Sequence, residues 1–247
     1  RDLYGKPRLA ELLTTLTREV EGPAWWRILY LYPTVLKDDV LEAIATNDRI
    51  VNYVDLPLQS MSTPVLRRMR RGTTAEKQHA LLERIRHVVG DVAIRSTLIT
   101  CFPGETDADH QETLAAVRAG VFDLLGVFPY SREEGTPSFD LDGQVPDDVI
   151  EVRRAELMEA QQAVHFAWNE RQVGREFDVL VESVDPFSGV ASGRSPYDAP
   201  DVDGKVHVRD ARALEPGQLA RVRVTGVREY DLESELASPA PDLPEPG

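Results

Sequence analysis

Hydrophobic residues recur along the first 145 positions with two different spacings. Apolar residues three or four positions apart, as in amphipathic helices, are found at 9–20, 37–46, 65–69, from 73 onward and around 114–117. Between them lie short apolar runs typical of buried strands, at 26–31, 50–56, 92–99 and 121–128. Regular alternation of strands and helices predicts a parallel sheet or barrel with helices on its outside.

The region is too short for a closed eight-stranded barrel, which typically needs ~250 residues. It has four predicted strands and begins in a polar loop, so we expect a barrel that is incomplete at its N-terminal side. The helix that starts at 73 should open with a capping box over 73–76 and bury Leu81, Ile85 and Val88.

The pattern changes after residue 145. One long helix is predicted from Pro146 to Arg171, because proline and acidic residues favour a helix start. Short alternating segments, which predict a small β-barrel, then follow at 177–184, 189–192, 205–208, 219–227 and 232–236. The predicted organisation is a partial barrel at 1–145, a connecting helix at 146–172, a β-barrel at 173–236 and a disordered tail at 237–247.

Composition narrows the possible functions. No apolar run approaches the ~20 residues of a membrane span, and the chain has one cysteine, so it forms no internal disulfide and fits a reducing cytoplasm. The net charge is −14, and residues 172–247 carry 8 basic against 15 acidic side chains. This balance weighs against nucleic-acid binding and suits a basic protein partner, unless the acidity serves only solubility.

The segment 101–106, Cys-Phe-Pro-Gly-Glu-Thr, holds the main candidate chemistry. It follows a predicted buried strand, and a helix is expected to open directly on Thr106. Ligands of parallel barrels bind at such strand-to-helix junctions. We also expect the Pro-Gly turn to leave backbone N–H groups free for an anionic or polar ligand group.

Four segments together resemble the methylthiotransferase family of radical S-adenosylmethionine enzymes. They are 56–60 (Leu-Pro-Leu-Gln-Ser), 68–72 (Arg-Met-Arg-Arg-Gly), 101–106 and 130–136 (Tyr-Ser-Arg-Glu-Glu-Gly-Thr). The closing β-domain resembles a TRAM domain. The resemblance implies an α/β fold: a partial radical-SAM (TIM-like) barrel of parallel strands with outer helices, followed by a small all-β TRAM (OB-like) barrel.

The family has two branches, and the sequence favours one of them. Segments 193–208 and 229–232 and the loop 30–33 resemble the branch that methylthiolates the β-carbon of an aspartate in ribosomal small-subunit protein twelve. Ser60, where that branch usually has histidine, matches the branch that modifies tRNA adenosine instead. A third interpretation, from outside enzymology, is a noncatalytic module whose acidic β-domain docks a basic protein. For the chain itself we expect a cytoplasmic monomer.

The resemblance implies S-adenosylmethionine and two 4Fe–4S clusters as cofactors, and such clusters are usually held by several cysteine thiolates. This chain has one cysteine, Cys101, at a position where the family usually has glycine. We therefore expect a C-terminal fragment of such an enzyme, lacking the N-terminal domain and the cluster-binding loop and inactive alone. No catalytic residue and no metal ligand is assigned to it.

The resemblance also implies binding residues. The expected cofactor-binding residues are Gln59, Ser60, Arg95, Phe102, Pro103 and Gly104. Arg95 would pair with the cofactor's carboxylate, or else form a structural ion pair. Glu105 is expected to serve the helix start through the helix dipole.

Charged side chains supply the remaining predictions. The acids expected to dock the basic protein substrate are Asp198, Asp201, Asp203, Glu229 and Asp231. An arginine cluster at Arg67, Arg68, Arg70 and Arg71 would form a solvated helix end or hold a phosphate or an acidic surface.

Overall fold

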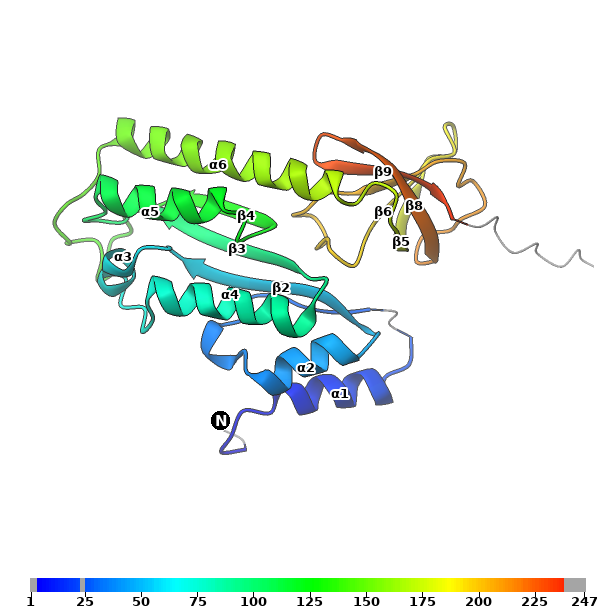
Figure 1. The fold of residues 1–247 in the computed structure, drawn as a ribbon, viewed down its shortest axis with the longest axis horizontal. Helices are drawn as coiled ribbons and strands as arrows, with labels where there is room; N and C mark the ends of the chain where they lie inside the picture. Colours follow the sequence, from blue (N-terminus) through cyan, green and yellow to red (C-terminus); the bar gives the residue numbers. More distant parts are fainter. Residues whose placement is uncertain (1–3, 23–24, 238–247) are drawn as a thin grey trace, which may run out of the picture. The chain divides into compact units, whose positions relative to one another are not determined.

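The computed structural model describes residues 4–22 and 25–237, and the chain divides into two compact units, Arg1–Val164 and His165–Gly247 (Figure 1). The helices are α1 (Leu9–Glu19), the 3-10 helix η1 (Pro33–Val35), α2 (Asp38–Thr46), α3 (Thr63–Arg68), α4 (Ala75–Val89), α5 (Asp107–Arg118) and α6 (Asp147–Glu170). Helix α6 runs across the boundary between the units. Among the described residues, no helix has the length and apolar character needed to cross a membrane.

The first unit is built on a four-stranded parallel sheet. Its strands, in spatial order, are β1 (Trp26–Ile28), β2 (Ile50–Gln59), β3 (Ala93–Thr100) and β4 (Leu124–Pro129). Each strand is followed by helical structure, as the alternating pattern predicts. Because all four strands are parallel, their carboxyl ends meet at one edge of the sheet.

The two faces of the sheet have different surroundings. Val54, Ile94 and Val127 point to the face that packs against the helices, in one continuous core. Alternate strand positions lie on the opposite face, which carries the partly exposed Arg95 and Phe128, the latter 57% exposed. This face therefore carries the charged Arg95 and the exposed ring of Phe128, outside the core formed with the helices.

Two local predictions in this unit need correction. Helix α4 is capped by Thr74, whose Oγ1 accepts a hydrogen bond from the Lys77 N–H, and not by a box that starts at Thr73. Its fully buried face includes Leu82 and Ile85, whereas Leu81 and Val88 are only partly buried. Each helical position turns the side chain by about 100°, so a shift of one residue changes the buried set.

The second unit contains a closed five-stranded barrel. Its strands are β5 (Glu176–Val184), β6 (Ala191–Arg194), β7 (Val206–Val208), β8 (Leu219–Arg228) and β9 (Asp231–Leu236), in the spatial order β5-β6-β7-β9-β8. All neighbours are antiparallel except β7 and β9. Small β-branched side chains such as Val179, Val206 and Val222 fill the interior. This is the fold class that the sequence predicts; the tail predicted over 237–247 lies, except for its first residue, outside the described residues.

Gly193 provides a test of the barrel packing. A Cβ atom at this position would collide with the backbone carbonyl oxygen of Leu180 on the paired strand β5. We expect Gly193→Ala to lower the free energy of unfolding by about 1–3 kcal/mol, measured by urea denaturation of the full chain. Gly226→Ala is the matched control, because its Cβ would meet only the flexible end of Glu233, at 3.9 Å. Equal stability of the two variants would contradict the packing described here.

Candidate functional site

Three neighbouring strands each end at or just before a residue with a strained backbone. Tyr30 after β1, Gln59 at the end of β2 and Cys101 after β3 all have positive φ angles, of 56°, 75° and 61°. A non-glycine residue in this region costs of order 1–3 kcal/mol and persists where the surrounding structure enforces it, often at functional sites. Ligands of parallel barrels bind at this edge of the sheet, and we therefore place the candidate site there.

Four backbone N–H groups of the loop 101–106 have hydrogen-bond partners. Its N–H donors pair as follows: Cys101 with Glu105 Oε2 (2.9 Å), Gly104 with Gly143 O (2.7 Å), Glu105 with Phe102 O (2.9 Å) and Thr106 with Asp109 Oδ2 (2.9 Å). The prediction that this turn leaves N–H groups free is therefore wrong for these four residues. The loop's contribution to binding must come mainly from side chains and from its shape.

Glu105 anchors the loop to helix α6. Its carboxylate forms an ion pair with Arg153 at 2.9 Å, and the two side chains are only 6% and 8% exposed. Burial raises the pKa of Glu105 despite the neighbouring guanidinium. The helix start expected to depend on Glu105 is instead capped by Thr106 and Asp109, which form a capping box.

Arg68 locks the other side of the same loop. Its Nε donates to the Pro103 carbonyl oxygen at 2.6 Å, and its Nη2 donates to the Asp142 carboxylate at 2.7 Å. The hydrogen bond from Arg68 lowers the pKa of Asp142. Gly104 is required here, because it has a φ of +84° and a Cβ would overlap the Arg68 guanidinium. Arg68 is thus a structural residue and differs from the solvated arginine expected for this cluster.

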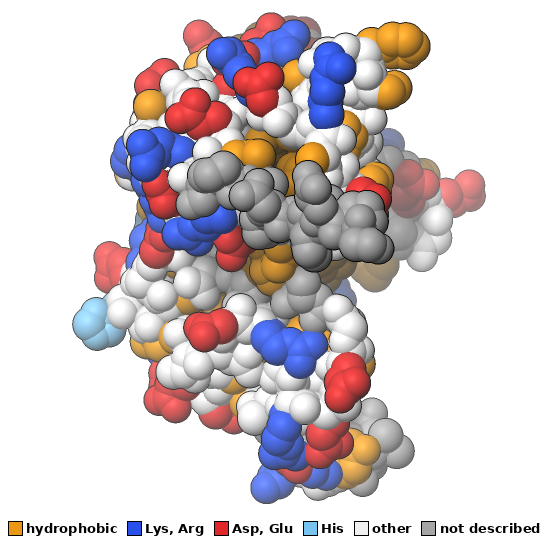
Figure 2. All heavy atoms as spheres, turned by 90° about the vertical axis from the view of Figure 1, so that its right-hand side faces the viewer, with side chains coloured by type: hydrophobic (Ala, Val, Ile, Leu, Met, Phe, Trp, Pro, Cys, Tyr) orange, Lys and Arg blue, Asp and Glu red, His pale blue; other side chains and the backbone are white. Residues whose placement is uncertain are grey.

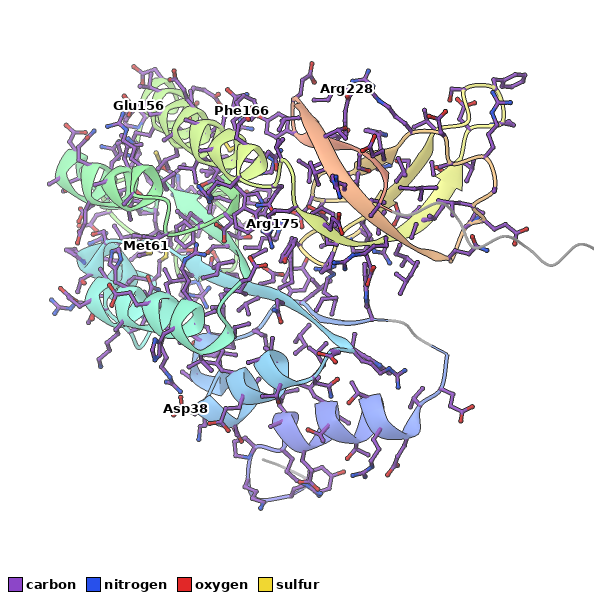
Figure 3. The ribbon with its side chains drawn as sticks, turned by 45° about the vertical axis from the view of Figure 1, so that its right-hand side comes forward. Asp38, Met61, Glu156, Phe166, Arg175 and Arg228 are labelled. Carbon is purple, nitrogen blue, oxygen red and sulfur yellow. The ribbon has the colours of Figure 1, made fainter. Side chains whose placement is uncertain are left out.

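A chain of hydroxyl and carboxylate groups joins the end of β2 to the start of α5. Ser60 is 2% exposed, and its Oγ accepts the Ser62 N–H at 3.1 Å. Ser62 Oγ in turn donates to Asp109 Oδ1 at 2.6 Å. Burial opposes ionisation of Asp109, but the hydrogen bonds from Ser62 and Thr106 outweigh it and lower the pKa. Met61, labelled in Figure 3, lies in this link and is fully buried.

Gln59 and Arg95, two predicted cofactor residues, have partners inside the sheet. Gln59 Nε2 donates to the Pro57 carbonyl at 3.1 Å. Arg95 Nη1 lies 3.4 Å from Asp55 Oδ1, and the Asp55 side chain is only 2% exposed. Of the two roles expected for Arg95, the structure shows the ion pair.

Phe102 lines a hollow at the strand ends. Its ring packs edge-to-face on Tyr130, with 5.2 Å between centroids. The hollow measures about 240 Å³ and is lined by Arg68, Met69, Arg70, Arg71, Ile99, Phe102, Pro137, Ser138 and Leu141. It brings together two segments of the family resemblance, 68–72 and 101–106.

The predicted docking acids of the barrel fall into two groups. Asp198 accepts the Ser195 N–H at 3.1 Å, Asp203 accepts the Ala199 N–H at 2.8 Å, and Asp231 accepts the Lys205 N–H at 2.9 Å. These three carboxylates hold loops of the domain. Asp201 and Glu229 are exposed. They belong to neighbouring turns, because a Cβ on Gly204 would touch the Tyr230 carbonyl.

Sequence reasoning missed three charged residues that organise the site: Asp55, Asp109 and Arg153. Asp55 interrupts an apolar strand, and a buried charge in such a run requires a partner. That signal was available in the sequence. Arg153 lies in a helix rich in charged residues, and nothing local distinguishes it from its exposed neighbours. Within the described parts of the chain, no group of His, Cys, Asp and Glu side chains is arranged to hold a metal ion.

The Glu105–Arg153 pair yields a quantitative prediction. Arg153→Met leaves a buried carboxylate without its cation, and we expect a loss of about 3–5 kcal/mol in the free energy of unfolding at pH 7. Arg154→Met is the control, because Arg154 is exposed and lies 4.0 Å from Glu151. The control should change by less than about 0.5 kcal/mol in urea denaturation.

The pH dependence checks the cause of this loss. A raised folded-state pKa means that the unfolded chain binds fewer protons, so the contribution of Glu105 to stability falls as pH rises through the interval between its unfolded and folded pKa values. Removing Arg153 raises the folded-state pKa of Glu105 further and widens the interval between its unfolded and folded pKa values. The deficit of Arg153→Met should therefore be smallest at acidic pH and grow toward neutrality. A deficit that does not depend on pH would rule out the buried charge as its cause.

Comparison with known proteins identifies both units. Residues 2–117 match the radical SAM superfamily, and residues 173–236 match the TRAM domain. Ribosomal protein uS12 methylthiotransferase RimO from Acaryochloris marina is 43% identical over 96% of this chain and 54% of its own length. RimO from Synechococcus sp. strain RCC307 is 46% identical over 95% of this chain and 48% of its own.

Among solved structures, the radical SAM enzyme coproporphyrinogen III oxidase (HemN) from Escherichia coli matches with a TM-score of 0.48 and 20% identity, over 66% of this chain and 37% of its own. The family assignment rests on the sequence relatives. The chain spans about half the length of the curated relatives it matches, and it belongs to the radical SAM methylthiotransferase family.

Proposed function

We propose that this chain is part of an enzyme that methylthiolates the β-carbon of an aspartate in ribosomal protein uS12. The observation that carries this proposal is the similarity to uS12 methylthiotransferases, at 41–46% identity, over both units of the chain. The order of elements agrees with it, since a parallel α/β sheet with strained strand ends is followed by a TRAM barrel.

S-adenosylmethionine fits the hollow beside Phe102. A nucleoside needs apolar walls and an aromatic neighbour, and Ile99, Phe102 and Leu141 supply them. Of the other predicted cofactor residues, Gln59, Ser60, Pro103 and Gly104 lie near the strand ends but are not among the residues that line this hollow. The cofactor supplies radical chemistry when it is bound together with an iron–sulfur cluster.

Iron–sulfur clusters do not fit the residues of this chain. Such clusters need several thiolates, and the single cysteine, Cys101, is buried with a pKa raised by burial. We therefore derive no catalytic step from this chain. Its proposed contribution is to bind the cofactor's nucleoside and to dock the protein substrate.

The charges of the barrel support a protein substrate over tRNA. Arginines on or directly after the strands pair with carboxylates on neighbouring strands: Arg194 with Glu182, Arg209 with Glu233, Arg221 with Asp178 and Arg223 with Glu176. Acidic and basic side chains are interspersed over the face shown in Figure 2. Paired arginines offer little to nucleic-acid phosphates, whereas the excess of acids would complement a basic ribosomal protein.

The function can be tested in the organism that encodes this chain. Deleting the encoding gene should abolish the methylthio group on the uS12 aspartate, detected by mass spectrometry of ribosomal proteins. Methylthiolated adenosine in tRNA, measured by nucleoside analysis, should remain unchanged. Loss of the tRNA modification with intact uS12 would favour the tRNA branch, and no change in either would favour a noncatalytic binding module.

The exposed acids of the barrel can be tested by binding. Asp201→Asn combined with Glu229→Gln should weaken binding of purified uS12 to the full chain severalfold at low salt, because complementary charge is lost. Asp178→Asn with Glu176→Gln is the control: it changes net charge equally but removes acids already paired with Arg221 and Arg223. Equal weakening in both double variants would show that net charge alone governs binding and would contradict a specific docking role for Asp201 and Glu229.

A further inference from the structure

A second, smaller hollow lies beside the first at the same edge of the sheet. It measures about 50 Å³ and is lined by Tyr32, Pro33, Thr34, Pro57, Leu58, Arg71, Gly72, Thr73 and Gln78. These residues come from the loop and 3-10 helix after β1, the end of β2, the turn between α3 and α4, and the first turns of α4. Arg71 is the one residue that lines both this recess and the hollow beside Phe102, as far as the described residues show.

The backbone of Arg71 is fixed by the way helix α3 ends. The Arg71 N–H donates to the Leu66 carbonyl at 2.9 Å, and the Arg70 N–H donates to the Arg67 carbonyl at 3.0 Å. These two bonds form a Schellman motif, in which Arg70, with a φ of +56°, occupies the position that usually holds glycine. The turn thereby places two consecutive arginines at the edge of the site.

Arg71 differs from three other arginines of this unit that are partly or fully buried: Arg68, Arg95 and Arg153 each pair with a carboxylate. Arg71 is partly buried, yet it has no side-chain partner among the described residues. A guanidinium removed from water gains most from a carboxylate or phosphate, to which it donates two parallel hydrogen bonds.

Gln78 provides an independent observation in the same recess. Its side chain is 2% exposed, and its Nε2 donates to the Leu58 carbonyl at 3.1 Å. Its Oε1 is buried and has no hydrogen-bond partner within the described part of the chain. Buried acceptors of this kind are nearly always satisfied, so the recess presents both an anion-binding group and an acceptor that requires an N–H donor.

We propose that this recess binds an amino-acid unit, whose carboxylate pairs with Arg71 and whose neighbouring N–H donates to Gln78 Oε1. A recess of about 50 Å³ takes only part of a ligand, such as a carboxylate and the N–H group beside it. Two sources share this chemistry: the methionine end of S-adenosylmethionine, and an acidic residue of a protein substrate with its own backbone N–H. The proposal that the recess binds an amino-acid unit rests on geometry alone. Only the choice of these two candidate sources rests on the proposed function.

The test is a titration of the full chain with paired probes. N-acetyl-aspartate methylamide is compared with its asparagine counterpart, and S-adenosylhomocysteine is compared with methylthioadenosine, which lacks the amino-acid end. Affinities come from calorimetry, and NMR of the side-chain amides reports whether the Gln78 signal moves. The source is identified by the pair in which the probe with the carboxylate binds more tightly than its partner.

We expect Arg71→Gln to weaken binding of the carboxylate probe about tenfold or more and to leave its neutral counterpart within about twofold, because a charge-assisted bidentate pair is lost. Arg67→Gln is the matched control, an exposed arginine of the same helix end. Arg71→Lys should fall between the parent and Arg71→Gln, since it keeps the charge and loses the fork geometry. Melting curves establish that each variant is folded.

Two results would overturn the proposal: carboxylate probes that bind Arg71→Gln as well as the parent chain, or a parent chain that shows no preference for either carboxylate probe over its neutral partner. The uS12 deletion experiment is independent of both. Carboxylate binding that depends on Arg71, together with intact uS12 methylthiolation in the deletion strain, would refute the proposed function and leave the recess standing.

Discussion

The buried pair of Glu105 and Arg153 is the interaction on which the site depends. One carboxylate accepts the Cys101 N–H and binds the guanidinium from α6, so it sets the path of the loop after β3 and ties that loop to a helix some fifty residues further along the chain. A buried ion pair adds little net stability compared with a hydrophobic contact. It does impose geometry, because either charge alone would be buried at high cost, and the loop is therefore held in one conformation.

The same principle governs the other side of the loop. Arg68 occupies the space that a side chain on Gly104 would fill, and it donates to the Pro103 carbonyl and to Asp142. Four backbone N–H groups of 101–106 also have partners, in the loop itself or at Asp109 and Gly143, so the loop offers few free donors. The strained residues Tyr30, Gln59 and Cys101 persist because networks of this kind surround the strand ends.

Many charged side chains of this protein form ion pairs or hydrogen bonds that hold its structure. Strand arginines of the barrel face carboxylates on adjacent strands, and three of the predicted docking acids hold loops of the barrel. Among the described residues, the Arg71 guanidinium and the side-chain Oε1 of Gln78 have no hydrogen-bond or ion-pair partner, and both residues line one recess at the edge of the sheet where the candidate site lies. The proposed binding of an amino-acid unit rests on these two groups.

The sequence by itself determined the fold class. Strand–helix alternation before residue 145 and short alternating segments after 174 follow from hydrophobic periodicity, which is a local property of the chain. It also located the loop 101–106 and the cap at Thr106, because turn and capping residues act over a few positions. The exact buried face of α4 was missed, since two adjacent threonines compete for the cap and the choice depends on packing.

Only the tertiary structure decided what the charged residues do. Arg95 was open to a ligand or a structural role, Arg68 to a solvated or an anion-binding role, and Glu105 was expected to serve the helix start. Each proved to have a partner far away in sequence, at Asp55, Asp142 and Arg153 respectively. No local pattern encodes such pairs, because they form when parallel strands and crossover helices bring distant segments together. The same folding placed Arg71, in the turn after α3, and Gln78, in the first turns of α4, in one recess with residues of the loop after β1 and the end of β2.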